Sequence, residues 1–346
     1  MRLSTLLLYL PLALAQAPVK SGDPILFGES GSYPRAIHLA DGSLLGTYTR
    51  WDVNNHTLVT VHSTDSGTTW TPHGEITTEP TATHDLDNPY VHHMPNGQVL
   101  AAFRNHDRDA SGWTHYRIVV CVSDDLGKTW RYLSTPAEMP AGPGIWEPFM
   151  QTSLDDSIQL YYSKETGPGG QDSIVRRTYD NGATWTEEQV FSGQDTNARD
   201  GMIAVAPLAD RSPTKVAIFE SGDTSKNPTE FSVITVRTND DGATWEPTRI
   251  PVYTPSGFSA GAPQIIRVGN RLVASFGSNE LGGTWPEGAL QVMVSYDGGL
   301  TWSDRTTVKE RPAMWSGMIH VDDDSFLALY ESNGTCYAQK MVFQSA

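Results

Sequence analysis

The stretch Ser63-Thr64-Asp65-Ser66-Gly67-Thr68-Thr69-Trp70 decides the fold of this 346-residue chain, because it returns four more times. The other copies begin at Ser123, Thr178, Thr238 and Ser295, so successive copies start 60, 55, 60 and 57 residues apart. Their shared pattern is Ser/Thr-x-Asp-x-Gly-x-Thr-Trp. Self-similarity at a period of this length indicates an array of equivalent structural units.

Each position of the octapeptide suits a tight β-turn. The Asp accepts hydrogen bonds from backbone N–H groups of its own turn, and the Gly supplies a positive φ at no steric cost. We expect the Thr to open the next strand and the Trp to pack between neighbouring units. We call each copy of the octapeptide a box. The five box aspartates therefore indicate turn formation rather than catalysis; they are Asp65, Asp125, Asp180, Asp240 and Asp297.

Strand patterns surround every copy of the box. Alternating apolar residues precede it, as at 58–62 and 290–294, and further upstream Asp41-Gly42 and Asn96-Gly97 mark hairpin turns. Each unit thus holds four strands, and such units bury their faces by stacking around an axis. We predict an all-β, six-bladed β-propeller with five box turns.

The sixth unit has no box. Residues 317–343 supply three of its strands, and the N-terminal residues 24–28 are expected to supply the fourth and close the ring. In this arrangement Cys121 lies on the third strand of the second unit and Cys336 on the third strand of the sixth. Because a disulfide needs Cα atoms within about 7 Å, we expect two free, buried thiols.

The N-terminus has the features of a secretory signal peptide. Arg2 precedes an apolar run at residues 6–15, and small residues follow at a cleavage position. The run is too short to span a bilayer as a helix. We expect residues 1–17 to be removed, leaving residues 18–346 as one secreted, extracellular propeller domain, monomeric and not membrane-bound. Asn55 and Asn333 then stand in candidate glycosylation sequons.

The charge balance restricts the partners. The chain has 40 acidic and 24 basic residues, a net charge of −16. Such a charge repels phosphate backbones and anionic membrane surfaces. Nucleic acid is therefore excluded as an expected partner, and neutral or cationic ligands are favoured.

Two acidic residues are candidates for catalysis, because propellers build their pockets near the axis. Glu147 follows Trp146 and precedes Pro148 at the start of the third unit's innermost strand, and Glu220 ends the apolar run 216–219. A carboxylate in such surroundings is costly unless it is paired or catalytic. Two carboxylates from neighbouring units can converge as an acid/base and a nucleophile for glycoside hydrolysis. The alternative is that each one only caps backbone groups or pairs with an arginine.

The boxes resemble the Asp-box, or BNR, repeats of the sialidase superfamily. Tyr33-Pro34-Arg35 and the segments 144–149, 199–202 and 216–221 resemble the fungal exo-arabinanases of glycoside hydrolase family 93. This resemblance implies an enzyme that releases arabinobiose from the non-reducing end of α-1,5-L-arabinan, a plant cell-wall polysaccharide, with retention of configuration and without a metal or other cofactor. It implies Glu220 as nucleophile and Glu147 as acid/base, with the reverse assignment left open.

Further residues near the axis are candidates for binding the substrate. Trp315 stands where the resemblance leads us to expect a Tyr, and an indole N–H can donate a hydrogen bond but has no acid–base chemistry. The His residues show no HExxH or other close metal-ligand spacing, so no metal site is expected. The expected substrate-binding residues are Arg35, Asn88, Arg104, Trp146, Glu165, Arg199, Asp200 and Trp315.

Two other functions remain open. A sialidase needs an arginine triad for the sugar carboxylate, but Gly261-Ala262-Pro263-Gln264 has no Arg where the last member is expected, and the net charge of −16 disfavours an anionic sugar. A propeller that only binds glycans keeps the boxes and loses the paired acids. Whether Glu147 and Glu220 converge therefore separates an enzyme from a binding protein.

Overall fold

The computed structural model describes residues 17–167, 169–194, 196 and 198–344. The expected signal peptide lies outside these residues except for Ala17, so its removal stays a prediction. Within the described ranges the chain is built of strands, and its helical element is a single 3-10 turn, η1 (Asn279–Leu281). No helix of this part is both long and apolar enough to cross a membrane.

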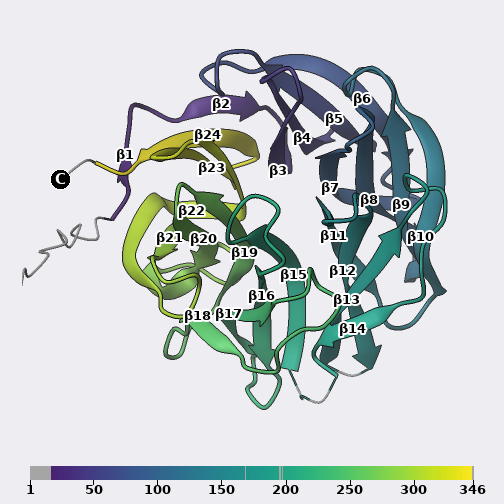
Figure 1. The fold of residues 1–346 in the computed structure, drawn as a ribbon. Helices are drawn as coiled ribbons and strands as arrows, with labels where there is room; N and C mark the ends of the chain where they lie inside the picture. Colours follow the sequence, from purple (N-terminus) through teal and green to yellow (C-terminus); the bar gives the residue numbers. More distant parts are fainter. Residues whose placement is uncertain (1–16, 168, 195, 197, 345–346) are drawn as a thin grey trace, which may run out of the picture.

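The strands follow one another in antiparallel sets of four around a common centre (Figure 1). The first two sets are β3 (Gly31–His38), β4 (Leu44–Trp51), β5 (Asn55–Ser63) and β6 (Thr71–Pro80), and β7 (His84–His93), β8 (Val99–Asp109), β9 (Gly112–Ser123) and β10 (Arg131–Pro140). The next two are β11 (Ile145–Thr152), β12 (Ile158–Gly167), β13 (Gly170–Thr178) and β14 (Gln189–Ser192), and β15 (Ala198–Pro207), β16 (Lys215–Asp223), β17 (Glu230–Thr238) and β18 (Ile250–Tyr253). The remaining strands are β19 (Ala260–Val268), β20 (Arg271–Ser278), β21 (Gly288–Ser295), β22 (Ser303–Asp322), β23 (Ser325–Ser332) and β24 (Thr335–Val342), with the N-terminal β1 (Val19–Lys20) and β2 (Ile25–Gly28).

The two ends of the chain share the last set of strands. The 20-residue β22 pairs with β21 through its first half and with β23 through its second half, so it belongs to the fifth and sixth sets. The strand β2 pairs antiparallel with β24, with Ile25 opposite Ala338, as the sequence predicts. The all-β class is confirmed, and the arrangement of the sheets is consistent with a propeller.

The five boxes form the turns between the third and fourth strands of the first five sets. In the first box, Thr69 donates to the Asp65 carboxylate through its backbone N–H (2.9 Å) and its hydroxyl (2.6 Å), and Ser63 Oγ donates to it at 2.8 Å. These bonds, led by the Thr69 hydroxyl, lower the pKa of Asp65 to about 2. The structural role of the box Asp is confirmed, whereas the Thr closes the turn on that Asp instead of opening the next strand, which begins after the Trp.

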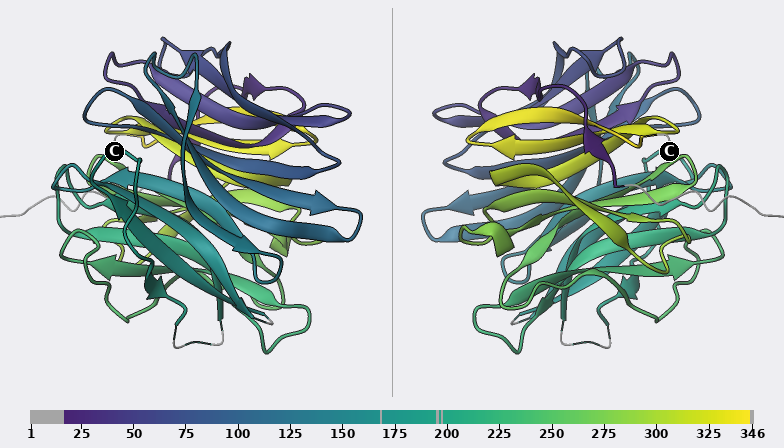
Figure 2. Two further views of the ribbon diagram at one scale, coloured as in Figure 1. Left: turned by 90° about the vertical axis from the view of Figure 1, so that its right-hand side faces the viewer. Right: turned by 90° about the vertical axis from the view of Figure 1, so that its left-hand side faces the viewer.

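Each box also packs on the second strand of the preceding set. A Cβ at Gly127 would lie 2.7 Å from Leu45 Cδ2 on β4, and one at Gly67 would lie 2.3 Å from Leu327 Cδ1 on β23. The first set therefore contacts the last. The hydrophobic clusters likewise lie between neighbouring sets, and the side views show the sheets layered on one another (Figure 2). Cys121 and Cys336 are free and buried, as predicted.

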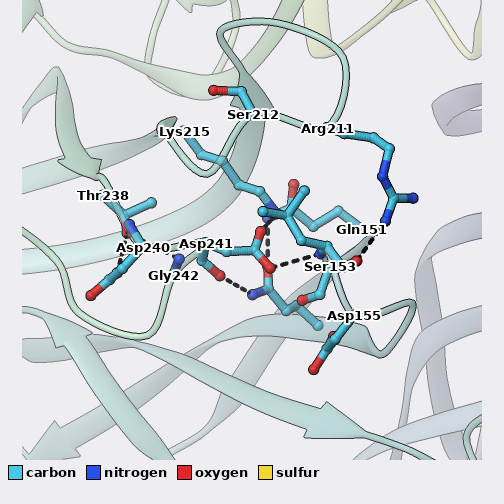
Figure 3. A network of polar contacts seen from close by, with 12 residues as sticks. Gln151, Ser153, Asp155, Arg211, Ser212, Lys215, Thr238, Asp240, Asp241 and Gly242 are labelled. Carbon is cyan, nitrogen blue, oxygen red and sulfur yellow. Dashed lines mark hydrogen bonds and ion pairs between the residues drawn. The ribbon is translucent and has the colours of Figure 1, made fainter.

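A buried ion pair of the fourth set lies where this set contacts the third (Figure 3). Lys215, at the start of β16, has a side chain only 3% exposed and pairs with Asp241 in the fourth box. Asp241 accepts from the Leu154 N–H at 2.8 Å through its carboxylate and from Arg177 at 2.8 Å through its backbone oxygen. Because both charges are removed from water, each depends on the other.

Candidate active site

A β-bulge interrupts the first strand of every set at the same place, and these strands lie nearest the centre (Figure 1). Each bulge contains one residue with a left-handed φ, which is uncommon for non-glycine residues. These residues are Tyr33 (59°), Asn88 (55°), Glu147 (41°), Met202 (56°), Ala262 (50°) and Trp315 (57°). We call them the bulge residues. Bulges that re-aim side chains often lie next to active sites.

The bulge residues meet at the centre of the molecule. Tyr33, Met202 and Ala262 form one buried cluster although they come from three different sets, and Trp315 packs against it. The rings of Tyr33 and Trp315 lie 6.3 Å apart. Glu147 occupies the equivalent position in the third set, so its carboxylate belongs to the same centre.

The backbone of the bulges holds the side chains of neighbouring sets. The N–H of Ala262 donates to Glu220 Oε2 at 2.8 Å, and the N–H of Met202 donates to Ser163 Oγ at 3.0 Å. Ser163 and Glu220 lie at matching positions within the second strands of the third and fourth sets, opposite Trp146 and Gly201. The bulge of one set thus fixes the polar side chain of the set before it.

The charge of Glu220 acts on the ionisation of Glu147. Burial is the main cause that raises the pKa of Glu147 to about 7, and the charge of Glu220 raises it further. Burial also raises the pKa of Glu220, while the Ala262 N–H and Arg199 favour its ionised form. A buried carboxyl group with a pKa near 7 is suited to donate a proton, and a hydrogen-bonded carboxylate beside it is suited to act as a nucleophile.

Gly261 leaves the space that the Glu220 carboxylate occupies, and Gly201 leaves space for Gln171. A Cβ at Gly261, the residue before the fifth bulge, would lie 2.3 Å from Glu220 Oε2. Gly201 lies opposite Glu220 in the strand register, and a Cβ there would lie 2.0 Å from Gln171 Nε2. A side chain at Gly261 would therefore displace the carboxylate.

The Trp146 ring and the Arg104 guanidinium lie beside Glu147. The Arg104 guanidinium lies 5.3 Å from the centre of the Trp146 ring and donates to Asp85 (3.2 Å) and Asp87 (3.4 Å). Trp146 is met edge-on by Trp113, at 5.4 Å between ring centres. Arg104 also favours the ionised form of Glu147. Arg104 and Trp146 thus lie beside the candidate acid, and their contact with a substrate stays a prediction.

A second polar bridge connects the third and fourth sets beside both carboxylates. Arg199 donates to Glu165 Oε1 at 2.9 Å, and the other Glu165 oxygen accepts from the Gly144 N–H at 2.8 Å. Arg199 lowers the pKa of Glu147 and of Glu220. Glu165 and Arg199 thus lie at the site, and their contact with a substrate stays a prediction.

One predicted binding residue is corrected by the structure. Asp200 is fully buried, and both its oxygens bind Arg249, at 2.6 and 2.8 Å, so it has no surface to offer a ligand. Arg35 is 2% exposed; it stacks on Tyr33 and donates to the Trp315 carbonyl at 3.1 Å. Contact of Arg35 with a substrate stays a prediction.

Asn88 and Trp315 are bulge residues. Asn88 is 5% exposed, and its side-chain oxygen has no hydrogen-bond partner among the residues that the structure describes. Trp315 is half-buried. Substrate contacts of both stay predictions.

The sequence did not single out Tyr33, Met202, Ala262 or Gly261 as site residues. A signal for four of the six bulges was present, since Pro follows the bulge residue in Tyr33-Pro34, Asn88-Pro89, Glu147-Pro148 and Ala262-Pro263. Pro disfavours the helical region for the residue before it but does not by itself reveal a bulge. Among the described residues, no group of three His, Cys, Asp or Glu side chains is placed to hold a metal ion.

The family described as the BNR repeat-like domain matches residues 49–250, more than half of the chain, which therefore belongs to this family. A comparison with curated proteins returned no match. Among solved structures, the α-L-arabinofuranosidase of Fusarium graminearum in complex with arabinobiose is similar, with 18% identity over 94% of this chain and 98% of that chain and a TM-score of 0.72.

Two further structures extend the likeness. The α-L-arabinanase of Penicillium chrysogenum in complex with arabinobiose has 16% identity over 94% of this chain and 98% of that chain, with a TM-score of 0.72. The NanB sialidase of Streptococcus pneumoniae has 10% identity over 93% of this chain and 70% of that chain, with a TM-score of 0.60. At these identities the likeness establishes the fold.

Proposed function

We propose that this protein is a retaining exo-glycoside hydrolase that releases arabinobiose from the non-reducing end of α-1,5-L-arabinan. Its scaffold in this proposal is a six-bladed propeller that β2 closes by pairing with β24. The proposal is supported by the surroundings of Glu147 and Glu220, which come from neighbouring sets: burial and the charge of Glu220 raise the pKa of Glu147 to about 7, and the Ala262 N–H donates to Glu220.

Glu147 is the acid/base and Glu220 the nucleophile in this mechanism. Glu147 donates its proton to the glycosidic oxygen while a Glu220 oxygen attacks the anomeric carbon, which breaks the bond to the leaving group and forms a glycosyl ester. Glu147, now ionised, takes a proton from water, and the water oxygen attacks the same carbon and releases Glu220. Two displacements at one carbon retain its configuration.

A neutral pentose polymer fits the site better than an anionic sugar. Arg104 and Arg199 are each paired with carboxylates, so their charge is already neutralised locally. The net charge of −16 further disfavours an anionic substrate. Two similar fungal structures hold arabinobiose, which supports this choice of substrate. We extend the proposal to a secreted, monomeric enzyme acting on plant cell walls.

The experiment that tests the proposal is product analysis on linear arabinan, branched arabinan, arabinogalactan and a sialoside. We expect arabinobiose as the early product from linear arabinan. NMR of the newly released arabinobiose should show that its anomeric carbon keeps the configuration of the substrate. No sugar release from any of the four would instead favour a glycan-binding protein, and sialic acid release would favour a sialidase.

Conservative variants test the two carboxylates. Glu147→Gln and Glu220→Gln should each lower kcat/KM by a factor of at least about 10³, since each removes a group required in the transition state. The matched control is Glu331→Gln, because Glu331 is buried at the corresponding position of β23, where it accepts the Gly334 N–H at 2.6 Å. Full activity of a Glu147 or Glu220 variant would remove that residue from the mechanism.

A further inference from the structure

We infer that Trp285, in the connection between η1 and β21, is a sugar-binding platform beside Glu220. The inference rests on the proposed function, because it assigns a subsite of the same proposed active site. Trp285 lies in the fifth set, between residues 279–281 of η1 and the start of β21 at Gly288.

Trp285 lies against the backbone that holds Glu220. A Cβ at Gly261 would lie 2.9 and 3.1 Å from Trp285 Cζ2 and Cη2, and 2.3 Å from Glu220 Oε2. The indole edge and the carboxylate therefore share the same side of Gly261. A sugar that places its anomeric carbon at Glu220 has its ring within reach of Trp285.

Phe231 supports the indole from β17. The two rings are stacked, with centres 6.0 Å apart and planes inclined by 23°. Phe231 in turn lies over Gly222, where a Cβ would be 2.8 Å from Phe231 Cε1 and 3.2 Å from Arg199 Cβ. The aromatic pair thus extends from Arg199 to Gly261, on the Glu220 side of the proposed active site.

The connection that carries Trp285 is held in one conformation by polar contacts. The Glu287 N–H donates to the Thr284 carbonyl at 2.9 Å, and the Glu287 carboxylate accepts from Arg311 Nε at 2.9 Å. At the base of the connection, Ser259 links the two aromatic elements: its N–H donates to Asn279 (2.8 Å), and its hydroxyl accepts from the Phe231 N–H (3.2 Å). Trp285 is therefore positioned before a ligand arrives, which reduces the entropy lost on binding.

The exposure of the pair suits a ligand better than core packing. Both rings are half-buried, and neither belongs to the hydrophobic clusters formed by the described residues of the fourth and fifth sets. Ligand pockets combine aromatic surfaces with a few converging polar groups, here Glu147, Glu220 and Arg199. The ligand class is a neutral sugar ring, whose C–H face packs on the indole while its hydroxyls meet the polar groups.

The test measures binding separately from turnover. Glu220→Gln is the parent protein, and Trp285→Leu, Trp285→Phe and Leu281→Ala are each added to it. Calorimetry measures the Kd of each of these four proteins for linear α-1,5-arabinotetraose. Leu fills space without an aromatic face, Phe keeps such a face, and Leu281 is a half-exposed residue of η1. We expect Trp285→Leu to raise Kd about tenfold, Trp285→Phe by less than about threefold, and Leu281→Ala not at all.

The outcomes separate this inference from the proposed function. If the Glu220→Gln parent binds no arabinotetraose, the proposed substrate is wrong and the platform assignment is lost with it. If the parent binds and Trp285→Leu binds equally well, only the platform is overturned. Thermal unfolding of each variant checks the fold, and Phe231→Leu gives the same comparison if Trp285→Leu does not fold.

Discussion

Replacing Gly261 by Ala tests whether the position of one carboxylate controls activity. The added Cβ would lie 2.3 Å from Glu220 Oε2, whereas ordinary contacts begin at 3.4 Å, so the carboxylate has to move by about 1 Å. The nearest clashing atom is the end of a flexible side chain, and the Trp285 ring, 2.9 Å from the added Cβ, has to shift as well. Neither is backbone, and we therefore expect the protein to fold. A shift of this size in a reacting group costs about 100-fold in rate. We expect kcat/KM on linear arabinan to fall by about that factor.

Gly277→Ala is the matched control for this change. Gly277 lies directly opposite Gly261 in the strand register, but the nearest atom to a Cβ there is 3.9 Å away. The two variants add the same methyl group to paired strands, and only one displaces Glu220. We expect Gly277→Ala to keep kcat/KM within about twofold of wild type, with equal urea midpoints as the fold check. A folded Gly261→Ala enzyme with wild-type kcat/KM would refute the reasoning.

Three further predictions concern pH and stability. Activity needs protonated Glu147 and ionised Glu220, so kcat/KM should fall above pH 7 as Glu147 loses its proton, and it should fall at acid pH as Glu220 becomes protonated. A kcat/KM that stays constant from pH 6 to 9 would contradict this assignment. Lys215→Met leaves Asp241 buried without its partner and should lower the free energy of urea unfolding by about 3–5 kcal/mol. Adding Asp241→Asn should restore part of this stability, whereas no loss in the single variant would mean that the ion pair is unimportant. Burial lowers the pKa of His106 to about 3, so on acidification this imidazole binds a proton in the unfolded chain before it does so in the folded protein. The free energy of unfolding should therefore fall as the pH drops from about 6.5 towards 3, by up to about 1.4 kcal/mol per pH unit. Between pH 7 and 5 the His106→Asn variant should lose less stability than wild type, and an equal loss would contradict the shift.

The fold was predictable because its main signal is local. Each box closes a turn through bonds within eight residues, such as those from Ser63 and Thr69 to Asp65, so the sequence alone is enough to identify it. The spacing of the boxes then set the number of strands between them. The pairing of β2 with β24 followed from the strand missing in the last unit.

The two carboxylates could be singled out for a different reason, although their catalytic role stays a prediction. Glu147 follows Trp146 on β11, the first strand of its set, and Glu220 ends the apolar run 216–219 on β16, the second strand of its set. A charge in such surroundings is costly without a function. The sequence could not supply their neighbours. Trp285 and Gly261 reach Glu220 from another set of strands, and no local pattern connects them.

Which side chains of a strand face the pocket was decided only by the tertiary structure. Arg199 and Asp200 are adjacent, and the period of two in a strand sends them to opposite sides; Arg199 reaches the site, while Asp200 is buried against Arg249. A bulge adds one residue to a strand and reverses this alternation beyond it. The sequence by itself determined the turns, the repeat and the two acids, because these depend on neighbours along the chain. The bulges, the space at Gly261 and the exposure of each polar residue depend on contacts between strands that are far apart in sequence.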